Sequence, residues 1–132
     1  TLYGAYCGGG RPGSRCVRKG DWKLTKYEVE KTGVQHTQLF NLKDNPHEFM
    51  KEHHDPKVRA LTGAKPKPEQ VNLASHPKYA AKLKEMEAVL LDEMRHHDDP
   101  YRFWNQPDDG LPVPIFRERN KNKKPKKPRK KQ

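Results

Sequence analysis

Two cysteines and two arginines near the N-terminus are the first residues whose types and spacing could do chemistry. Cys7 and Cys16 flank a glycine-rich loop, residues 8–14, that contains Arg11, and Arg15 follows this loop directly. Glycines expose backbone N–H groups and arginine donates two parallel hydrogen bonds, a combination that binds sulfate or carboxylate. A solvated hairpin tip is the simpler interpretation of this loop, and the alternative that we carry forward is substrate contact by Arg11 and Arg15.

The same two cysteines could form a covalent link. They lie at opposite ends of a predicted hairpin, where cross-strand positions can meet the geometry of a disulfide. In an exported protein, a disulfide between Cys7 and Cys16 would staple the loop, whereas in a reducing compartment both would stay free thiols. Two cysteines do not decide between these compartments.

Two histidine-rich turns, residues 53–55 (HHD) and 96–99 (HHDD), are the other groups that could bind an ion. Histidine and carboxylate side chains are common metal ligands. Adjacent residues on a helix, however, point about 100° apart and rarely share one ion. We therefore predict a solvated turn and a helix end at these positions, and no metal site.

Four segments with β-strand character must position these residues: 2–6, 15–19, 21–29 and 35–42. Apolar and polar residues alternate along them, and aromatic or β-branched side chains are frequent. In the third segment, Trp22, Leu24 and Lys26 fall on one face. Because short turns connect the segments, we predict antiparallel neighbours in a meander.

One amphipathic helix is predicted over residues 76–97. Ser75 is its expected N-cap, and Pro77 lies in the first turn, where a missing N–H costs nothing. Apolar residues recur every three or four positions and form one stripe: Tyr79, Leu83, Met86, Leu90 and Met94. A short helix is also expected within residues 56–61. A small antiparallel sheet of about four strands packed against one C-terminal helix is an α+β layer pair.

Composition divides the chain into three parts. Residues 1–104 form the predicted subdomain, with the sheet in 2–42, an irregular insert in 47–74 and the helix in 76–97. Residues 105–116 are rich in proline and should run extended. Residues 117–132 hold ten Lys or Arg and one acid, so they carry +9 of the net charge of +11 and leave +2 for the remainder. This basic tail cannot bury a core and is expected to be disordered.

Three short segments carry a resemblance to a known family: residues 15–24 (RCVRKGDWKL), 38–48 (QLFNLKDNPHE) and 71–74 (VNLA), followed by a helix that closes on Asp99-Pro100. In this order and at these spacings they resemble the C-terminal subdomain of the formylglycine-dependent sulfatases, a branch of the alkaline phosphatase superfamily. The chain departs from the family pattern in Asn41 and Asn45, which replace the usual acids, in a longer insert at 49–70 and in its basic tail.

The second of these segments also has a reading that does not depend on the family. Leu39, Phe40 and Leu42 are expected to supply core contacts, and Glu48 is expected to pair with a Lys or Arg. Core packing and ion pairing both stabilise the fold. We therefore predict a structural role for the segment.

The resemblance implies hydrolysis of sulfate esters by a formylglycine, made from the Cys of a Cys-x-Pro/Ala-x-Arg motif, with the help of a divalent cation, usually calcium. Neither Cys7 nor Cys16 is followed by such a motif. We therefore expect no catalytic residue and no cofactor in this chain. Calcium and the formylglycine would belong to a parent enzyme, the longer protein in which this chain would be one subdomain.

The resemblance further implies a scaffold that packs on an N-terminal catalytic domain and lines one wall of the pocket for a sulfated small molecule or carbohydrate. The chain starts with strand-like residues, so we expect an upstream part to be missing. A bacterial parent would favour a periplasmic or secreted location. No run of about 18 apolar residues predicts a transmembrane segment.

The basic tail supports an alternative of another class. Runs of lysine and arginine bind polyanions through the release of counterions, without reading a sequence. On this reading the chain is a small basic binding module, and its partner is a sulfated polysaccharide or a nucleic acid. A solubilising tail without a partner is the simpler explanation of the same residues.

Overall fold

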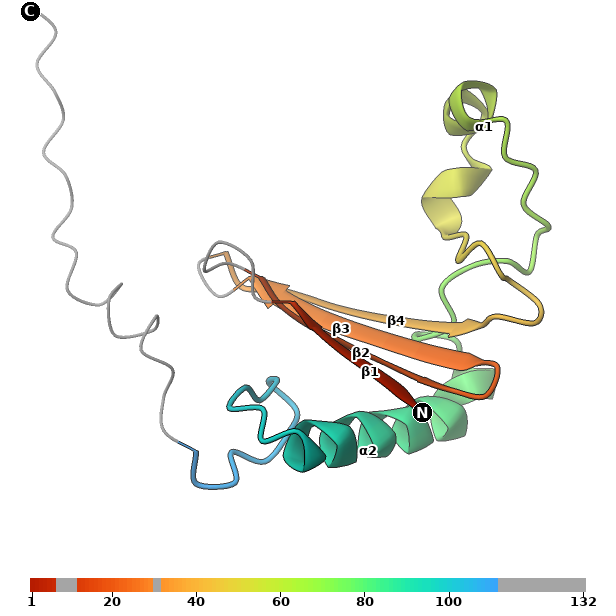
Figure 1. The fold of residues 1–132 in the computed structure, drawn as a ribbon. Helices are drawn as coiled ribbons and strands as arrows, with labels where there is room; N and C mark the ends of the chain where they lie inside the picture. Colours follow the sequence, from red (N-terminus) through yellow and green to blue (C-terminus); the bar gives the residue numbers. More distant parts are fainter. Residues whose placement is uncertain (7–11, 30–31, 112–132) are drawn as a thin grey trace, which may run out of the picture.

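The computed structural model describes residues 1–6, 12–29 and 32–111, and it has the expected α+β architecture (Figure 1). Four antiparallel strands form one sheet in the order β1-β2-β3-β4: β1 (Leu2–Tyr6), β2 (Pro12–Lys19), β3 (Trp22–Val29) and β4 (Val34–Asn41). The predicted meander is confirmed. The predicted disulfide partner Cys7, the predicted substrate contact Arg11 and the basic tail lie outside the described residues.

The strand β2 is longer than predicted. It begins at Pro12, whereas the sequence analysis placed residues 12–14 in a loop. Gly13 and Ser14 pair with Glu28 and Tyr27 of β3. The strand β3 continues to Val29, so its last residues have backbone groups that can pair beyond the predicted start of β2. Residues 12–14 form these additional pairs and lengthen β2.

The main helix also differs at its start from the prediction. The chain enters it through a short 3-10 helix, η3 (Pro77–Tyr79), and the α-helix α2 runs over Ala80–His96. The predicted N-cap Ser75 is wrong, because the His76 side chain accepts the hydrogen bond from the backbone N–H of Lys78. The ring nitrogen of His76 thus accepts from one of the backbone N–H groups that have no partner within the helix, as the side-chain oxygen of a serine N-cap would.

The apolar stripe of α2 packs on one face of the sheet. Met86, Leu90 and Met94 are buried, and Tyr79 and Leu83 lie at the margin of the same cluster. Their partners from the sheet are Val17, Leu24 and Leu39, one each from β2, β3 and β4. Tyr101 and Phe103 follow α2, meet edge to face at 5.1 Å and complete this core. The predicted apolar stripe is thus confirmed.

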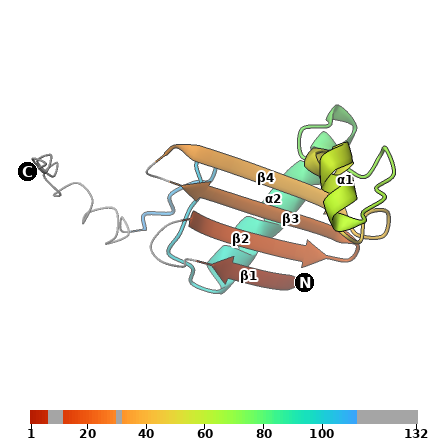
Figure 2. The same cartoon turned by 90° about the horizontal axis from the view of Figure 1, so that it is seen from above.

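The two faces of the sheet are unlike. Figure 2 looks onto the face that α2 does not cover, which we call the outer face. Strand alternation and register place the following side chains on it: Leu2, Gly4, Tyr6, Ser14, Cys16, Arg18, Lys23, Thr25, Tyr27, Val29, Val34, His36, Gln38 and Phe40. Phe40 is buried there, whereas Leu2, Tyr6 and Val34 are exposed. The predicted core contacts of Leu39 and Phe40 are confirmed, on opposite faces.

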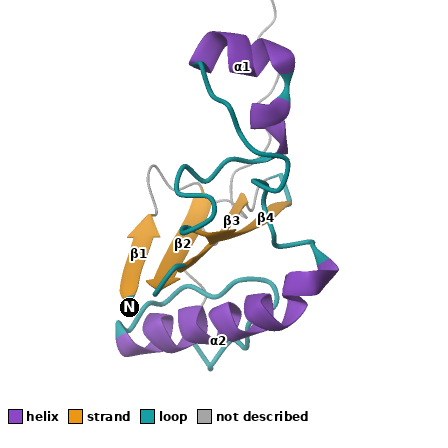
Figure 3. Cartoon of the chain, turned by 90° about the vertical axis from the view of Figure 1, so that its right-hand side faces the viewer, coloured by secondary structure: helices purple, strands orange, loops and turns teal. Residues whose placement is uncertain are grey.

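Residues 47–69 leave the sheet as an arm that stands on the side of the outer face (Figures 1 and 3). The arm contains a 3-10 helix, η2 (Lys51–His54), and a short α-helix, α1 (Pro56–Thr62), close to the expected position. Seen from above the outer face, α1 lies over one end of β3 and β4 and leaves the rest of the sheet uncovered (Figure 2). Within the described part of the chain, no helix is both long and apolar enough to cross a membrane.

Candidate functional site

A buried ion pair joins the sheet to the segment that follows α2. The Arg15 side chain, on β2, is 3% exposed and the Asp99 side chain is 6% exposed. Arg15 donates from Nε to Asp99 Oδ2 and from Nη2 to Asp99 Oδ1, the second at 2.9 Å. A bidentate pair of this kind fixes both the distance and the orientation of its partners.

Further hydrogen bonds complete the surroundings of Asp99. The hydroxyl of Tyr3 donates to Asp99 Oδ2, and the backbone N–H of Tyr101 donates to Asp99 Oδ1 at 2.9 Å. The Tyr101 ring covers Arg15, with 4.8 Å between the guanidinium carbon and the ring centroid, and its hydroxyl donates to Glu28. Asp99 therefore ties β1, β2 and the chain after α2 to one point.

These contacts set the protonation of the cluster. Burial raises the pKa of the Asp99 carboxyl, but hydrogen bonds from Arg15, Tyr3 and the Tyr101 backbone outweigh burial and hold the pKa below its ordinary value of 3.8. Burial and the bond to Asp99 raise the pKa of the Tyr3 hydroxyl above its ordinary value of 10.0. At neutral pH the cluster consists of a carboxylate, a guanidinium and a neutral phenol.

The structure describes only one of the two arginines for which we predicted substrate contact. Arg11 lies outside the described residues. Arg15 points to the face that α2 covers, and its guanidinium is bound by Asp99 and lies beneath Tyr101. This placement favours a structural role for Arg15, so substrate contact by either arginine stays a prediction. In the sequence, Asp99, its partner, stands out only as the end of the helix and as part of the histidine-rich group 96–99.

A glycine makes the close packing of Tyr101 feasible. A Cβ added at Gly13 would overlap the Tyr101 ring, so no larger residue fits at this position without displacing the ring. Its place in the glycine-rich segment 8–14 predicted a loop residue with an exposed backbone N–H. In the structure, the absence of a side chain at Gly13 allows the Tyr101 ring to lie directly against β2.

A second buried cation lies farther along the same face. Lys26 of β3 is 1% exposed, and its Nζ donates to Glu87 Oε1 at 2.7 Å and to Asn105 Oδ1 at 2.9 Å. The same Nζ lies 4.4 Å from the centroid of the Trp104 ring. Lys26 falls on the face predicted from the alternation of β3, and its partners come from α2 and the segment after it.

The free edge of β4 is covered by an asparagine. Asn72 accepts a hydrogen bond from the backbone N–H of Leu39 at 3.0 Å and donates to the carbonyl of Thr37 at 2.9 Å. The backbone N–H of Leu73 adds a bond to the carbonyl of Leu39 at 2.9 Å. Exposed strand edges attract other chains, and this segment occupies part of that edge.

The base of the arm is fixed by two further links. Glu48 accepts a hydrogen bond from Lys23 Nζ at 2.6 Å, which confirms the predicted pairing of Glu48 with a Lys or Arg. Asn45 is buried and forms two bonds with the backbone of Phe49: it donates to the carbonyl and accepts from the N–H, each at 2.9 Å. A carboxylate could supply only the acceptor of these two bonds.

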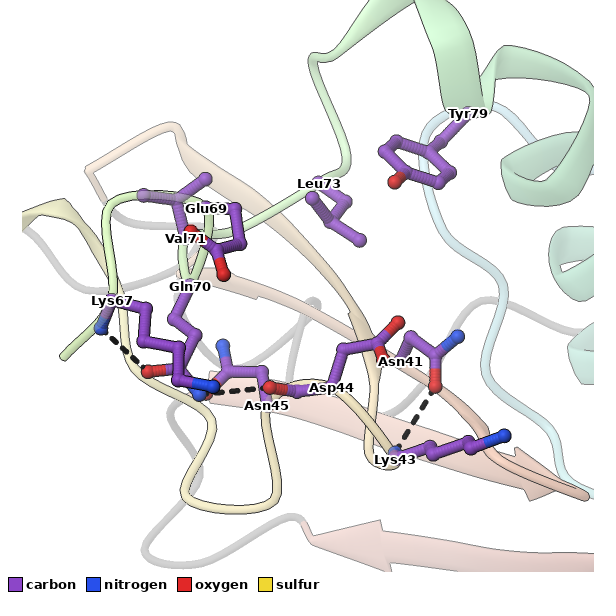
Figure 4. A pocket seen from close by; sticks show the side chains of 10 residues that line it. All are labelled: Asn41, Lys43, Asp44, Asn45, Lys67, Glu69, Gln70, Val71, Leu73 and Tyr79. Atoms are coloured by element: carbon purple, nitrogen blue, oxygen red, sulfur yellow. Dashed lines mark hydrogen bonds between the residues drawn. The ribbon is translucent and has the colours of Figure 1, made fainter.

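A pocket of about 340 Å³ opens between the end of β4 and residues 67–73 (Figure 4). Val71, Leu73 and Tyr79 lie along one wall, opposite Asn41, Asp44 and Asn45. Two lysines and two carboxylates line this pocket: Lys43, Lys67, Asp44 and Glu69. Because these charges balance, the pocket has no excess of positive charge that would favour a sulfate ester.

The remaining predicted groups lie in different parts of the fold. Cys16 lies opposite Gly4 on the outer face, and because Cys7 is not described, the disulfide between them stays a prediction. His53 Nδ1 accepts a hydrogen bond from the backbone of Met50, and His54 Nε2 bonds the carbonyl of Gln70. Across residues 1–6, 12–29 and 32–111, no group of three or more His, Cys, Asp or Glu side chains is arranged to hold a metal ion.

Comparison of the chain with models of protein families, with curated proteins and with solved structures finds no match. What relates the three segments 15–24, 38–48 and 71–74 to one another is therefore the set of contacts within the chain. These contacts are the bonds of Arg15 to Asp99, of Lys23 to Glu48 and of Leu39 to Asn72. Each bond joins two segments that are far apart in the sequence.

The buried ion pair predicts how stability depends on pH. Asp99→Asn should lower the free energy of unfolding at pH 7 by about 3 kcal/mol, because it leaves the Arg15 charge buried without a partner charge. The folded pKa of Asp99 is depressed, so its stabilisation is complete above the ordinary value of 3.8 and is lost as the pH falls through the lower folded value. Urea unfolding at several pH values, followed by circular dichroism, measures both effects.

The matched control for this prediction is Asp92→Asn, because the Asp92 side chain is 78% exposed and lies 3.9 Å from Arg95. Exposed pairs of this kind contribute at most about 1 kcal/mol. The difference between the wild-type and Asp99→Asn proteins should shrink below pH 4, and a difference that stays constant down to pH 2 would contradict the assignment.

The amide of Asn45 gives a second prediction. Asn45→Asp should lower the free energy of unfolding by about 1–3 kcal/mol at pH 7, because the carbonyl of Phe49 would then face a carboxylate instead of a donor. Asn41→Asp is the matched control, since Asn41 uses its oxygen to accept from the backbone N–H of Lys43, which an aspartate can also do. Equal losses of stability for the two variants would show that the donor of Asn45 is unimportant.

Proposed function

We propose that this chain is the C-terminal subdomain of a sulfatase, an enzyme that hydrolyses sulfuric esters. The observation that carries the proposal is the set of three bonds between the segments on which the resemblance rests: Arg15 to Asp99, Lys23 to Glu48 and Leu39 to Asn72. Residues that occur together in the sequence pattern of the family thus meet in space and hold one compact unit.

The subdomain acts as a scaffold on this proposal. The helix α2 covers one face of the sheet, whereas Leu2, Tyr6 and Val34 on the outer face are 68%, 63% and 41% exposed. These three side chains lie on the two edge strands of the sheet, β1 and β4. The outer face is the surface on which the N-terminal catalytic domain of the parent enzyme would pack.

The chemistry itself belongs to the parent enzyme. The formylglycine and the calcium ion would be supplied by its catalytic domain, and the substrate would be a sulfate ester on a carbohydrate or another small organic molecule. The loop with Arg11, at the end of the β1–β2 hairpin, would form one wall of the substrate pocket. Export to the periplasm or the medium is the location that this proposal favours for a bacterial parent.

The test of this proposal is the coding sequence upstream of Thr1. We expect one open frame that carries a Cys-x-Pro/Ala-x-Arg motif and paired aspartates, and we expect its full product to hydrolyse an aryl sulfate. The 132-residue chain alone should be inactive, because neither cysteine is in the required motif. Hydrolysis by the chain alone, or an upstream frame without these motifs, would contradict the proposal.

The segregation of charge favours a second candidate function, binding of a polyanion through residues 117–132. These residues carry +9 of the net charge of +11. If they bind a sulfated polysaccharide or a nucleic acid, the affinity should fall steeply with salt, because each neutralised charge releases counterions. The affinity for heparin at 50 and 200 mM salt, measured with and without residues 117–132, tests this candidate. An affinity that survives the deletion would eliminate it.

A further inference from the structure

The arm ends in a short helix and a loop that are rich in basic residues and contain an exposed leucine. We define the arm tip as residues 56–68, which comprise α1 and the loop after it. They contain four Lys or Arg residues and no acid. The side chain of Leu61 is 88% exposed, more than Leu2 or Tyr6 on the outer face, and α1 has no buried residue. Packing against the core of the subdomain therefore does not account for the formation of α1.

The helix α1 is nevertheless well defined at both ends. Asp55 Oδ1 accepts hydrogen bonds from the backbone N–H groups of Lys57 at 2.8 Å and of Val58 at 3.4 Å. At the other end, Gly63 adopts φ 70° and its N–H bonds the carbonyl of Arg59 at 2.9 Å. Isolated helices of this length are unstable in water. Caps at both ends compensate in part for the missing contacts and present Leu61 in a fixed direction.

The arm is also tied to the sheet at its base. The Lys23–Glu48 pair and the two bonds of Asn45 hold its first part, and the Gln70 side chain donates to the carbonyl of Asp44 at 2.8 Å at its return. His54 joins the two parts through its bond to the Gln70 carbonyl at 2.9 Å. The arm tip is thus carried at a set position beyond the outer face (Figure 3).

We propose that the arm tip is a docking element whose partner is a protein surface with an apolar pocket for Leu61 and carboxylates around that pocket. Leu61 supplies the apolar anchor, and the excess of positive charge in residues 56–68 calls for an acidic rim. A sulfated polysaccharide would use the cations but offers no apolar pocket for Leu61, so the observations favour a protein.

The position of the arm identifies which protein surface this is. Because the arm stands on the side of the outer face and α1 lies over one end of β3 and β4, a body that packs on that end of the face also meets the arm tip (Figures 1 and 2). On the proposed function, on which this inference rests, that body is the catalytic domain. The insert that distinguishes this chain from the family pattern would then be a second contact between the two domains.

The test uses the parent enzyme with the photoreactive residue p-benzoylphenylalanine in place of Leu61. The matched control carries it in place of Ala81, which is exposed on α2 on the opposite side of the sheet. After irradiation, crosslinked peptides are identified by mass spectrometry. We expect position 61 to crosslink to a peptide of the catalytic domain that combines apolar and acidic residues, with a yield at least about tenfold above that of position 81.

Hydrogen exchange provides the second readout. The amides of residues 58–62 should exchange at least about tenfold more slowly in the parent enzyme than in the 132-residue chain, because docking suppresses local opening of α1. Leu61→Asp should remove this protection, whereas Ala81→Asp should keep it. Both substitutions are at exposed positions, so the subdomain should stay folded in each case.

The outcomes separate this inference from the proposed function. A parent enzyme that hydrolyses aryl sulfates but shows equal crosslinking at positions 61 and 81 and unprotected α1 amides would overturn the docking of the arm tip alone. A crosslink from position 61 to a sugar chain instead of a peptide would also overturn it. A parent without sulfatase motifs or activity would instead overturn the proposed function.

Discussion

The bond between Arg15 and Asp99 determines where the chain after α2 lies. Both side chains are almost fully buried, so each charge has lost most of its hydration and depends on the other. Tyr3 and the backbone of Tyr101 use the remaining acceptor capacity of Asp99. The end of α2, the first two strands and the aromatic segment therefore form one unit.

The two faces of the sheet differ in burial and in composition. One face is covered by the apolar stripe of α2. The same face carries two buried cations, Arg15 and Lys26, which are neutralised by Asp99 and Glu87. The outer face has small and polar residues along its middle and exposed apolar ones at its margins. This asymmetry, together with an arm that stands beside the outer face, is what a subdomain needs if it is to pack on a larger neighbour, and it is the physical basis of both proposals.

Two asparagines show how side-chain amides take the place of secondary structure in the connections. Asn72 bonds a backbone N–H and a carbonyl of β4, and Asn45 does the same to the backbone of Phe49. Each use requires a donor and an acceptor on one side chain.

The sequence by itself determined the four strands, the meander and the helix, because the alternation in β3 and the spacing of Met86, Leu90 and Met94 are local signals of which side faces the core. It also indicated that Glu48 pairs with a cation. Only the tertiary structure decided that Arg15 pairs with Asp99, because these residues are 84 positions apart. No local pattern encodes which distant charge will neutralise a buried one.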